Sequence, residues 1–490
     1  MSNPSPSSSR EEGRAFALRP AARHVVLAGI GEIGAKIIAF LPSAYLARVL
    51  GPESFGVIGY AVAFISPFII LADFGLPTYG VREVARGASP KQFAGEVLTV
   101  RLLLGILAAL IFVVVLPRVG KTGDELSVIR ASGWLIVSWA VGLGWVLQGL
   151  ELMGIVALAG TLTQVVYAAA VLVSVHGPAE AARVPLAQAA AEIAVALGVL
   201  YLLSRRGQMP RLGVSLGRAW TILRESSSLA AVRALRILLY NLDMLILGAL
   251  VAHELLGFFS ASSRIVFALL TVNVLLGTAL LPRISRAKDE HPVVVRGLVS
   301  DLGYATAAVT LPAAFGVTLL ARPIIILCFG DAFEHATHVL MILAWSIAIV
   351  PLGENFRRML WAFHLPAHDI RNLIVAIAVK VALCYLLIPK IGVVGVAMAV
   401  VLSELTLAAL SFFDVRRAVT DFEFFSKLGP PLAACLAMTA AVLPARALGL
   451  FPAIAIGAAV YVSALGVQRG IPKGLLVRNR GAGDSSGGPK

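Results

Sequence analysis

The feature that most constrains this chain is a succession of apolar runs, each long enough to cross a membrane. A spanning helix needs about 20 predominantly apolar residues. Fourteen runs of that kind follow one another, at 24–47, 55–80, 97–117, 127–149, 152–175, 184–203, 226–251, 257–281, 297–321, 337–356, 368–388, 392–413, 426–446 and 449–467. The sequence therefore predicts an all-α membrane protein with about 14 transmembrane helices.

Composition supports this fold class and removes several others. Only 14% of the residues are charged, whereas soluble domains carry roughly a quarter. The net charge of +14 comes from residues between apolar runs, where they set topology, so no nucleic-acid partner is expected. The three cysteines lie in apolar segments and are interpreted as small buried hydrophobes. We expect no metal, no cofactor and no catalytic residue.

The distribution of lysine and arginine predicts the orientation. With the N-terminus in the cytoplasm, 28 of the 41 basic residues fall on the cytoplasmic side and 8 on the outer side. Among the cytoplasmic set we count Arg82, Arg86, Lys91 and Arg101 after the second run, and Arg357, Arg358 and Arg371 after the tenth. Because cytoplasmic loops carry the excess of Lys and Arg, we expect an even number of spans in the cell (inner) membrane, with both termini cytoplasmic.

The first two runs, within 41–86, predict a tight helical hairpin with its corner at 48–56 and an acid, Asp73, buried in its second arm. The corner sequence 52–56 resembles 253–257, roughly 200 residues later, as expected of a parallel repeat. We therefore expect two six-helix lobes in a pseudo-twofold arrangement plus a terminal pair. The expected parts are a disordered cytoplasmic tail (1–23), an N-terminal lobe (24–206), a cytoplasmic linker (207–224), a C-terminal lobe (225–417), the helix pair (418–470) and a second disordered tail (471–490).

Charges inside the apolar runs indicate where a site lies. Five cations lie more than four residues from either end of a run: Lys36, Arg233, Arg236, Arg264 and Lys380. Each costs about 2.5–3.5 kcal/mol at the bilayer centre, so most should face a wet cavity. Helical spacing places Arg233, Arg236 and Asp243 on one stripe of their helix.

We interpret these cations as the basic wall of an anion-binding cavity between the lobes, since arginine holds two phosphate oxygens at once. The predicted anion-binding residues are Lys36, Arg233, Arg236 and Arg264. The alternative is structural ion pairing, of Glu32 with Lys36 or of Arg236 with Asp243. Arg233 and Lys380 also lie close enough to predicted helix ends to reach the membrane surface instead.

Four segments carry a resemblance to a known family: RVLGPESFGVIGYA (48–61), DFGLPTYGVREVAR (73–86), QGLE (148–151) and LLIPKIGVVGVAMAVVLSEL (386–405). Together they are similar to the polysaccharide biosynthesis exporters, the Wzx-type oligosaccharide flippases of the multidrug/oligosaccharidyl-lipid/polysaccharide superfamily. The resemblance extends over roughly residues 24–467.

The resemblance implies a V-shaped bundle that works by alternating access. Its implied substrate is a polyprenyl-pyrophosphate-linked oligosaccharide, moved from the cytoplasmic to the outer leaflet during cell-surface polysaccharide synthesis. Membrane lipids and glycan polymerase machinery are the implied partners. Other members use an ion gradient, and Asp73, Asp243 and Asp301 are the candidate coupling acids here.

Two other functions stay open at this point. A drug exporter of the same superfamily would need an acidic or aromatic cavity for its cationic substrates, and the basic wall argues against it. A membrane polymerase or ligase of lipid-linked glycan would usually carry a large outer loop with reactive groups, and the longest predicted outer loops are short.

Overall fold

The computed structural model describes residues 6–287, 292–363, 365–418 and 426–468. Side chains are described for 40–270, 297, 300–363, 365–418 and 427–468. Within these ranges all regular structure is helical. The elements are α1 (Pro6–Asp73), α2 (Leu76–Ala85), α3 (Pro90–Val115), η1 (Leu116–Arg118), α4 (Gly123–Ser132), α5 (Trp134–Val141), α6 (Gly144–Gly149), α7 (Met153–Ser174), η2 (Pro178–Glu180), α8 (Arg183–Arg205), α9 (Leu216–Leu250), α10 (His253–Ala287), α11 (Pro292–Leu319), α12 (Ala321–Phe329), η3 (Asp331–Phe333), α13 (Ala336–Leu343), α14 (Ser346–Ala362), α15 (Pro366–Ile391), α16 (Val393–Ala418), η4 (Ser426–Leu428), α17 (Gly429–Ala445), η5 (Arg446–Leu448) and α18 (Leu450–Val467).

The all-α membrane fold is confirmed, while the count of fourteen spans is not. Twelve segments in the described part of the chain are long and apolar enough to cross a membrane. The predicted first two spans meet in a single segment, Phe40–Ala85. The predicted span 226–251 lies in α9, which carries too many charges to be counted on composition. α1 begins at Pro6, inside the segment predicted as a tail.

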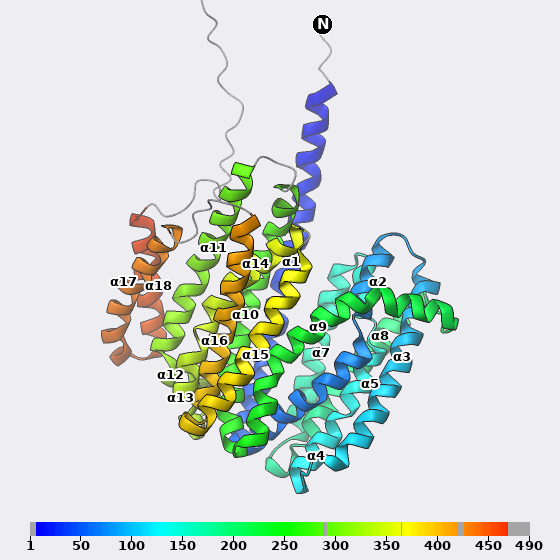
Figure 1. The fold of residues 1–490 in the computed structure, drawn as a ribbon, viewed down its shortest axis with the longest axis horizontal. Helices are drawn as coiled ribbons and strands as arrows, with labels where there is room; N and C mark the ends of the chain where they lie inside the picture. The colour runs from blue at the N-terminus through cyan, green and yellow to red at the C-terminus, as the bar shows by residue number, and fades with distance from the viewer. Residues whose placement is uncertain (1–5, 288–291, 364, 419–425, 469–490) are drawn as a thin grey trace, which may run out of the picture.

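Helices of the two halves of the chain form two groups, and α9 crosses between them. Figure 1 shows α2 to α8 on one side and α10 to α18 on the other, with α1 running down from the N-terminus and turning back toward α2. We call these groups the N-lobe and the C-lobe, and include the second arm of α1, after Gly51, in the N-lobe. Apolar side chains of both lobes form one continuous core around α1 and α10.

The predicted hairpin corner is a sharp kink at Gly51. Its φ of 72° and ψ of 174° lie where residues with a Cβ are rarely found. Pro52 follows at once, and a proline is compatible with the first turn of the new arm because its missing N–H would be unpaired there. The chain thereby reverses with no intervening loop.

The two corners that resemble each other in sequence contact each other in space. A Cβ added to Gly56 would lie 2.3 Å from the carbonyl oxygen of His253, and one added to Gly257 would lie 2.0 Å from that of Pro52. Only glycine allows two backbones to approach so closely. The weak internal repeat therefore corresponds to a direct contact between α1 and α10, where the lobes join.

Two predicted spans are interrupted by short breaks, and these breaks lie beside the candidate site that is described below. The second arm of α1 ends at Asp73, and Gly75 (φ 69°) and Pro77 start α2 after a tight turn. The predicted span 127–149 consists of α4, α5 and α6, with an extended residue at Gly142. Such breaks expose backbone groups and polar side chains inside the membrane, which is tolerated only where protein or a cavity covers them.

Candidate functional site

Helix α9 carries the polar stripe that the sequence predicts. Two of its arginines, Arg233 and Arg236, lie about one turn apart and bind carboxylates from opposite lobes. The carboxylates are Asp73 of the N-lobe and Glu354 of the C-lobe. The helix that connects the lobes is thus tied to both of them by adjacent ion pairs.

On the N-lobe side, Asp73 is shared by two arginines. Its Oδ1 lies 3.2 Å from Nη2 of Arg101, and its Oδ2 lies 3.0 Å from Nη1 of Arg233. Asp73 is 2% and Arg101 5% exposed, so this pair is fully buried. Arg101 was predicted to be a cytoplasmic loop residue, which is wrong, because it points from α3 into the lobe and also donates to the carbonyl of Gly142. A buried charge requires such partners.

On the C-lobe side, one carboxylate holds two arginines as well. Oε1 of Glu354 accepts from Arg236 at 2.7 Å and from Arg357 at 2.5 Å. Arg357 also reaches Asp369 at 2.6 Å, and the indole of Trp361 donates to Asp369 at 2.8 Å. The alternative considered for Arg236, an ion pair with Asp243, is not what the structure has, because the partner is Glu354.

These side chains line a cavity of about 670 Å³ between α2, α9, α14 and α15. We call its charged lining the arginine vestibule, and it comprises Arg233, Arg236, Arg357, Arg358, Glu354 and Asp369. Four cations face two acids, so the lining is net positive. In the described part of the structure, no hydrogen bond or ion pair engages the guanidinium of Arg358, which leaves it available to an anion.

A second, smaller cavity of about 250 Å³ lies farther along α9, and Tyr240 lines both cavities. It contains Arg264, which donates to the Ser43 hydroxyl and lies 4.8 Å from the centre of the Phe55 ring. It also contains Asp243, whose carboxylate lies 3.6 Å from the ammonium of Lys380.

The contacts of Lys380 contradict the expectation that this side chain reaches the membrane surface. The residue is 1% exposed, and its ammonium donates to the carbonyl of Leu239 at 2.5 Å. Lys380 does not reach the membrane surface, because the carbonyl of Leu239 and the carboxylate of Asp243 hold its ammonium inside the C-lobe.

The remaining predicted residues lie elsewhere. Asp301 pairs with Lys427 at 2.6 Å, and both side chains are about a third exposed. Neither of the two cavities is lined by Asp301. Lys36 belongs to α1, but its side chain lies outside the described residues, as does that of Glu32. The predicted roles of these two residues, in anion binding and in an ion pair, therefore stay predictions.

Sequence analysis missed the C-lobe half of the vestibule. Arg357 and Arg358 were assigned to a loop because the tenth apolar run ends at residue 356, whereas α14 continues to Ala362. The signal was present: Glu354, Arg357, Arg358 and Trp361 recur at helical spacing and so share one face of that helix.

Fold and charged cavities together define a two-lobed, multi-pass membrane protein. A family model described as polysaccharide biosynthesis protein matches residues 21–288, and one described as lipid II flippase MurJ matches residues 262–463. The chain belongs to the polysaccharide biosynthesis protein family.

Curated relatives resemble this chain in sequence, and solved structures share its fold. The probable low-salt glycan biosynthesis flippase Agl15 of Haloferax volcanii is 22% identical, covering 78% of this chain and 80% of its own. The O-antigen transporter of Escherichia coli, itself described as putative, is 21% identical, covering 80% of this chain and 96% of its own. The fold matches the inward closed conformation of lipid II flippase MurJ with a TM-score of 0.75, at 13% identity over 90% of this chain and 98% of that one. It matches an inward-facing multidrug resistance MATE transporter of the MOP superfamily with a TM-score of 0.67, at 17% identity over 79% of this chain and 94% of that one.

Proposed function

We propose that this protein is a flippase that moves a polyprenyl-pyrophosphate-linked oligosaccharide from the cytoplasmic to the outer leaflet of the cell membrane. The observation that carries the proposal is the net positive arginine vestibule between the lobes, where the guanidinium of Arg358 has no hydrogen bond or ion pair to any described residue. A pyrophosphate is a compact, doubly charged group whose oxygens suit several converging guanidinium groups. Names of the relatives point the same way.

In this mechanism the pyrophosphate enters the vestibule from the cytoplasmic side, with both termini of the chain in the cytoplasm. It competes with Asp73 and Glu354 for Arg233 and Arg236, and thereby loosens the two ion pairs that tie α9 to the lobes. A ligand can shift a two-state equilibrium only through such a difference in contacts. The lobes then rock about the contact of Gly56 with Gly257, and the site opens outward.

The roles of the other predicted residues belong to the same proposal. Arg264 and Lys36 would receive the pyrophosphate deeper between the lobes, while Asp243 and Asp73 would link transport to an ion gradient. Glycan polymerase machinery would take up the product on the outer face. A flippase of this kind binds and moves its substrate without making or breaking a covalent bond.

The test uses a strain that lacks the gene. We expect it to accumulate a full-length lipid-linked oligosaccharide on the cytoplasmic leaflet, and wild-type protein to restore export. Arg236→Ala and Arg358→Ala should each lower the export rate by at least about tenfold, because each removes a charge-assisted contact of about 1.5–3 kcal/mol. Arg417→Ala, which removes an exposed arginine at the end of α16 outside the vestibule, is the matched control.

The principal competing function is a drug exporter, for which the similarity to the MATE fold is the supporting observation. Such an exporter takes cationic substrates, which a net positive lining repels. Normal glycan lipids in the deletion strain, together with new sensitivity to cationic dyes, would establish that function instead. Export that is normal in both arginine variants would contradict the role of the vestibule.

A further inference from the structure

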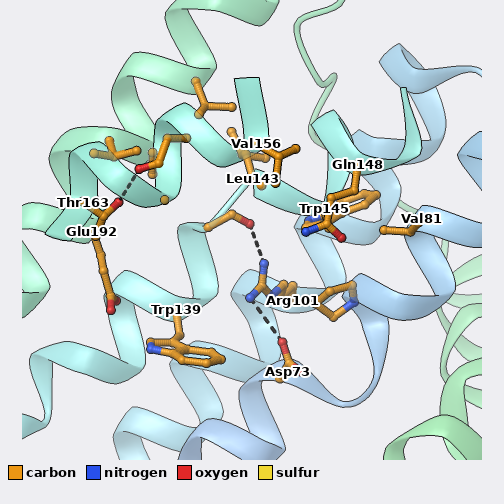
Figure 2. A pocket seen from close by; sticks show the side chains of 18 of the residues that line it. Asp73, Val81, Arg101, Trp139, Leu143, Trp145, Gln148, Val156, Thr163 and Glu192 are labelled. Atoms are coloured by element: carbon orange, nitrogen blue, oxygen red, sulfur yellow. Dashed lines mark hydrogen bonds and ion pairs between the residues drawn. The ribbon is translucent and has the colours of Figure 1, made fainter. Parts of the chain in front are cut away.

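The N-lobe contains a cavity that the proposed pyrophosphate site does not use. Its volume is about 850 Å³, within the range of about 300–1,000 Å³ typical of small-molecule sites. Figure 2 shows its interior, with the rings of Trp139 and Trp145 on either side of the Arg101–Asp73 pair and Glu192 near the edge of the view. We call it the N-lobe cavity.

Charged groups that line the N-lobe cavity already have partners. Arg101 and Arg233 share the single carboxylate of Asp73, and Arg82 pairs with Glu83. The two oxygens of Glu192 accept hydrogen bonds from Gln188 at 2.7 Å and from Ser138 at 2.6 Å. Because each of these charged groups has a charged or hydrogen-bonding partner within the protein, the cavity suits an uncharged polar molecule better than a free ion.

Two buried donors that line this cavity lack an acceptor. Nε1 of Trp145 and Nε of Arg101 have no hydrogen-bond partner among the described residues, and both side chains are 5% exposed or less. Buried donors are almost always paired in native structures, so each unpaired one calls for an explanation. Both could be satisfied by oxygen atoms of a molecule inside the cavity.

The remaining lining combines an aromatic face with further polar groups. Trp139 exposes 36% of its surface, and the amide of Gln148 and the hydroxyl of Thr163 belong to the same lining. A large, rigid aromatic surface with adaptable polar neighbours suits a ring that is apolar on its face and polar at its edge. A pyranose has this form, with C–H groups on its face and hydroxyl oxygens around its rim.

The position of the cavity connects it to the arginine vestibule. Thr78 and Arg233 line both spaces. A group held by Arg233 therefore lies at the entrance to the N-lobe cavity. In a lipid-linked oligosaccharide the first sugar is attached directly to the pyrophosphate, so an anion in the vestibule places a sugar next to this entrance.

From this arrangement we infer that the N-lobe cavity is a saccharide subsite that receives the sugar residues next to the pyrophosphate, with the Trp139 ring packed on a pyranose face and Trp145 and Arg101 donating to its hydroxyl oxygens. The inference rests on the proposed flippase function. It adds a positioning surface for the neutral part of the substrate, so that the lobes recognise the glycan as well as its charge.

The experiment compares two carriers on the full-length protein in lipid nanodiscs. The probes are undecaprenyl pyrophosphate and the same carrier bearing one N-acetylglucosamine, which has the hydroxyl oxygens common to pyranoses. We expect the sugar to tighten binding by about tenfold, the order expected for one aromatic contact with its hydrogen bonds. Trp139→Ala should remove this difference and leave binding of the bare carrier unchanged, while Trp139→Phe should restore part of it.

Trp134→Ala is the matched control, because Trp134 belongs to the same helix, is 56% exposed and does not line the cavity. It should preserve the full difference between the two carriers. Equal affinity for both carriers in wild-type protein, or an unchanged difference in Trp139→Ala, would overturn the subsite and leave the pyrophosphate site intact. If neither carrier binds, the proposed function itself fails and the subsite fails with it.

Discussion

The lobes are joined in two regions that differ in chemistry. At the corner contact, Gly56 and Gly257 bring the backbones of α1 and α10 together with no space for a side chain. In the arginine vestibule, long side chains of α9 reach carboxylates of both lobes, and Arg233 and Arg236 are 35% and 40% exposed. The first region depends on steric fit, while the second depends on charges that water and ligands can reach.

This difference indicates which region moves. Close backbone packing of the corner tolerates little change, since interiors are packed as densely as organic crystals. The guanidinium groups of Arg233 and Arg236 reach water, while their carboxylate partners Asp73 and Glu354 are largely buried, so the arginines can change partners while the carboxylates stay in place. We therefore propose that the corner serves as a pivot, and that an anionic substrate in the vestibule changes the balance between two arrangements.

The largest effect should come from Gly257→Val, which tests the pivot. Its Cβ would lie 2.0 Å from the carbonyl oxygen of Pro52, so the lobes would have to separate. Overpacking usually costs about 1–3 kcal/mol, and a clash with backbone belongs at the upper end. We expect a lower melting temperature in detergent and loss of glycan export. Gly198→Val, where nothing lies within 4 Å of the new Cβ, should leave both unchanged; equal behaviour of the two variants would disprove the pivot.

A smaller effect of the opposite sign is expected for Glu354→Gln, which sharpens the contrast in the vestibule. The change releases Arg236 and removes one of two carboxylates from Arg357. More guanidinium groups then become available, and undecaprenyl pyrophosphate should bind up to about tenfold more tightly. Titration of the protein in lipid nanodiscs with undecaprenyl pyrophosphate measures this change in affinity.

Glu334→Gln provides the matched control for that measurement. Glu334 pairs with Arg322 outside the vestibule, where both side chains are at least half exposed. Its substitution should not alter carrier binding. Unchanged or weaker binding in Glu354→Gln would mean that Glu354 supports the anion site and does not compete with the substrate for it.

The smallest effect is expected for Asp301→Asn. Its partner Lys427 and Asp301 itself are each about a third exposed, and pairs of that kind contribute about 0–1 kcal/mol. We expect normal export and a melting temperature within a few degrees of wild type. Loss of export with normal stability would instead support the prediction that Asp301 is a coupling acid.

Much of the architecture could be predicted because the membrane simplifies the problem. A segment of about 20 apolar residues has few alternatives to a spanning helix, so the runs after the first hairpin, other than 226–251, correspond to segments that are long and apolar enough to cross a membrane. Short breaks at Asp73 and Gly142 were missed because the apolar runs continue through them. In the same way, α14 was cut short because charged residues at its end look like a loop.

The candidate site was only half predictable. Charge in an apolar run showed that Arg233 and Arg236 need polar surroundings, since an unpaired charge in the bilayer is costly. It did not show which partner each one has. Asp73 and Arg101 are 28 residues apart, and Arg236 and Glu354 are 118 apart, so only the packing of helices brings them together.

The sequence by itself determined the fold class and the helix that carries the polar stripe, because hydrophobic length, charge and local spacing are properties of single segments. The family followed from the resemblance of short motifs such as RVLGPESFGVIGYA (48–61). Tertiary structure alone decided which carboxylate each arginine binds, that Lys380 stays inside the C-lobe, and that Thr78 and Arg233 line two cavities at once. The physical reason is that pairing and cavity shape depend on helices meeting across long sequence separations, where many arrangements satisfy the same apolar pattern equally well.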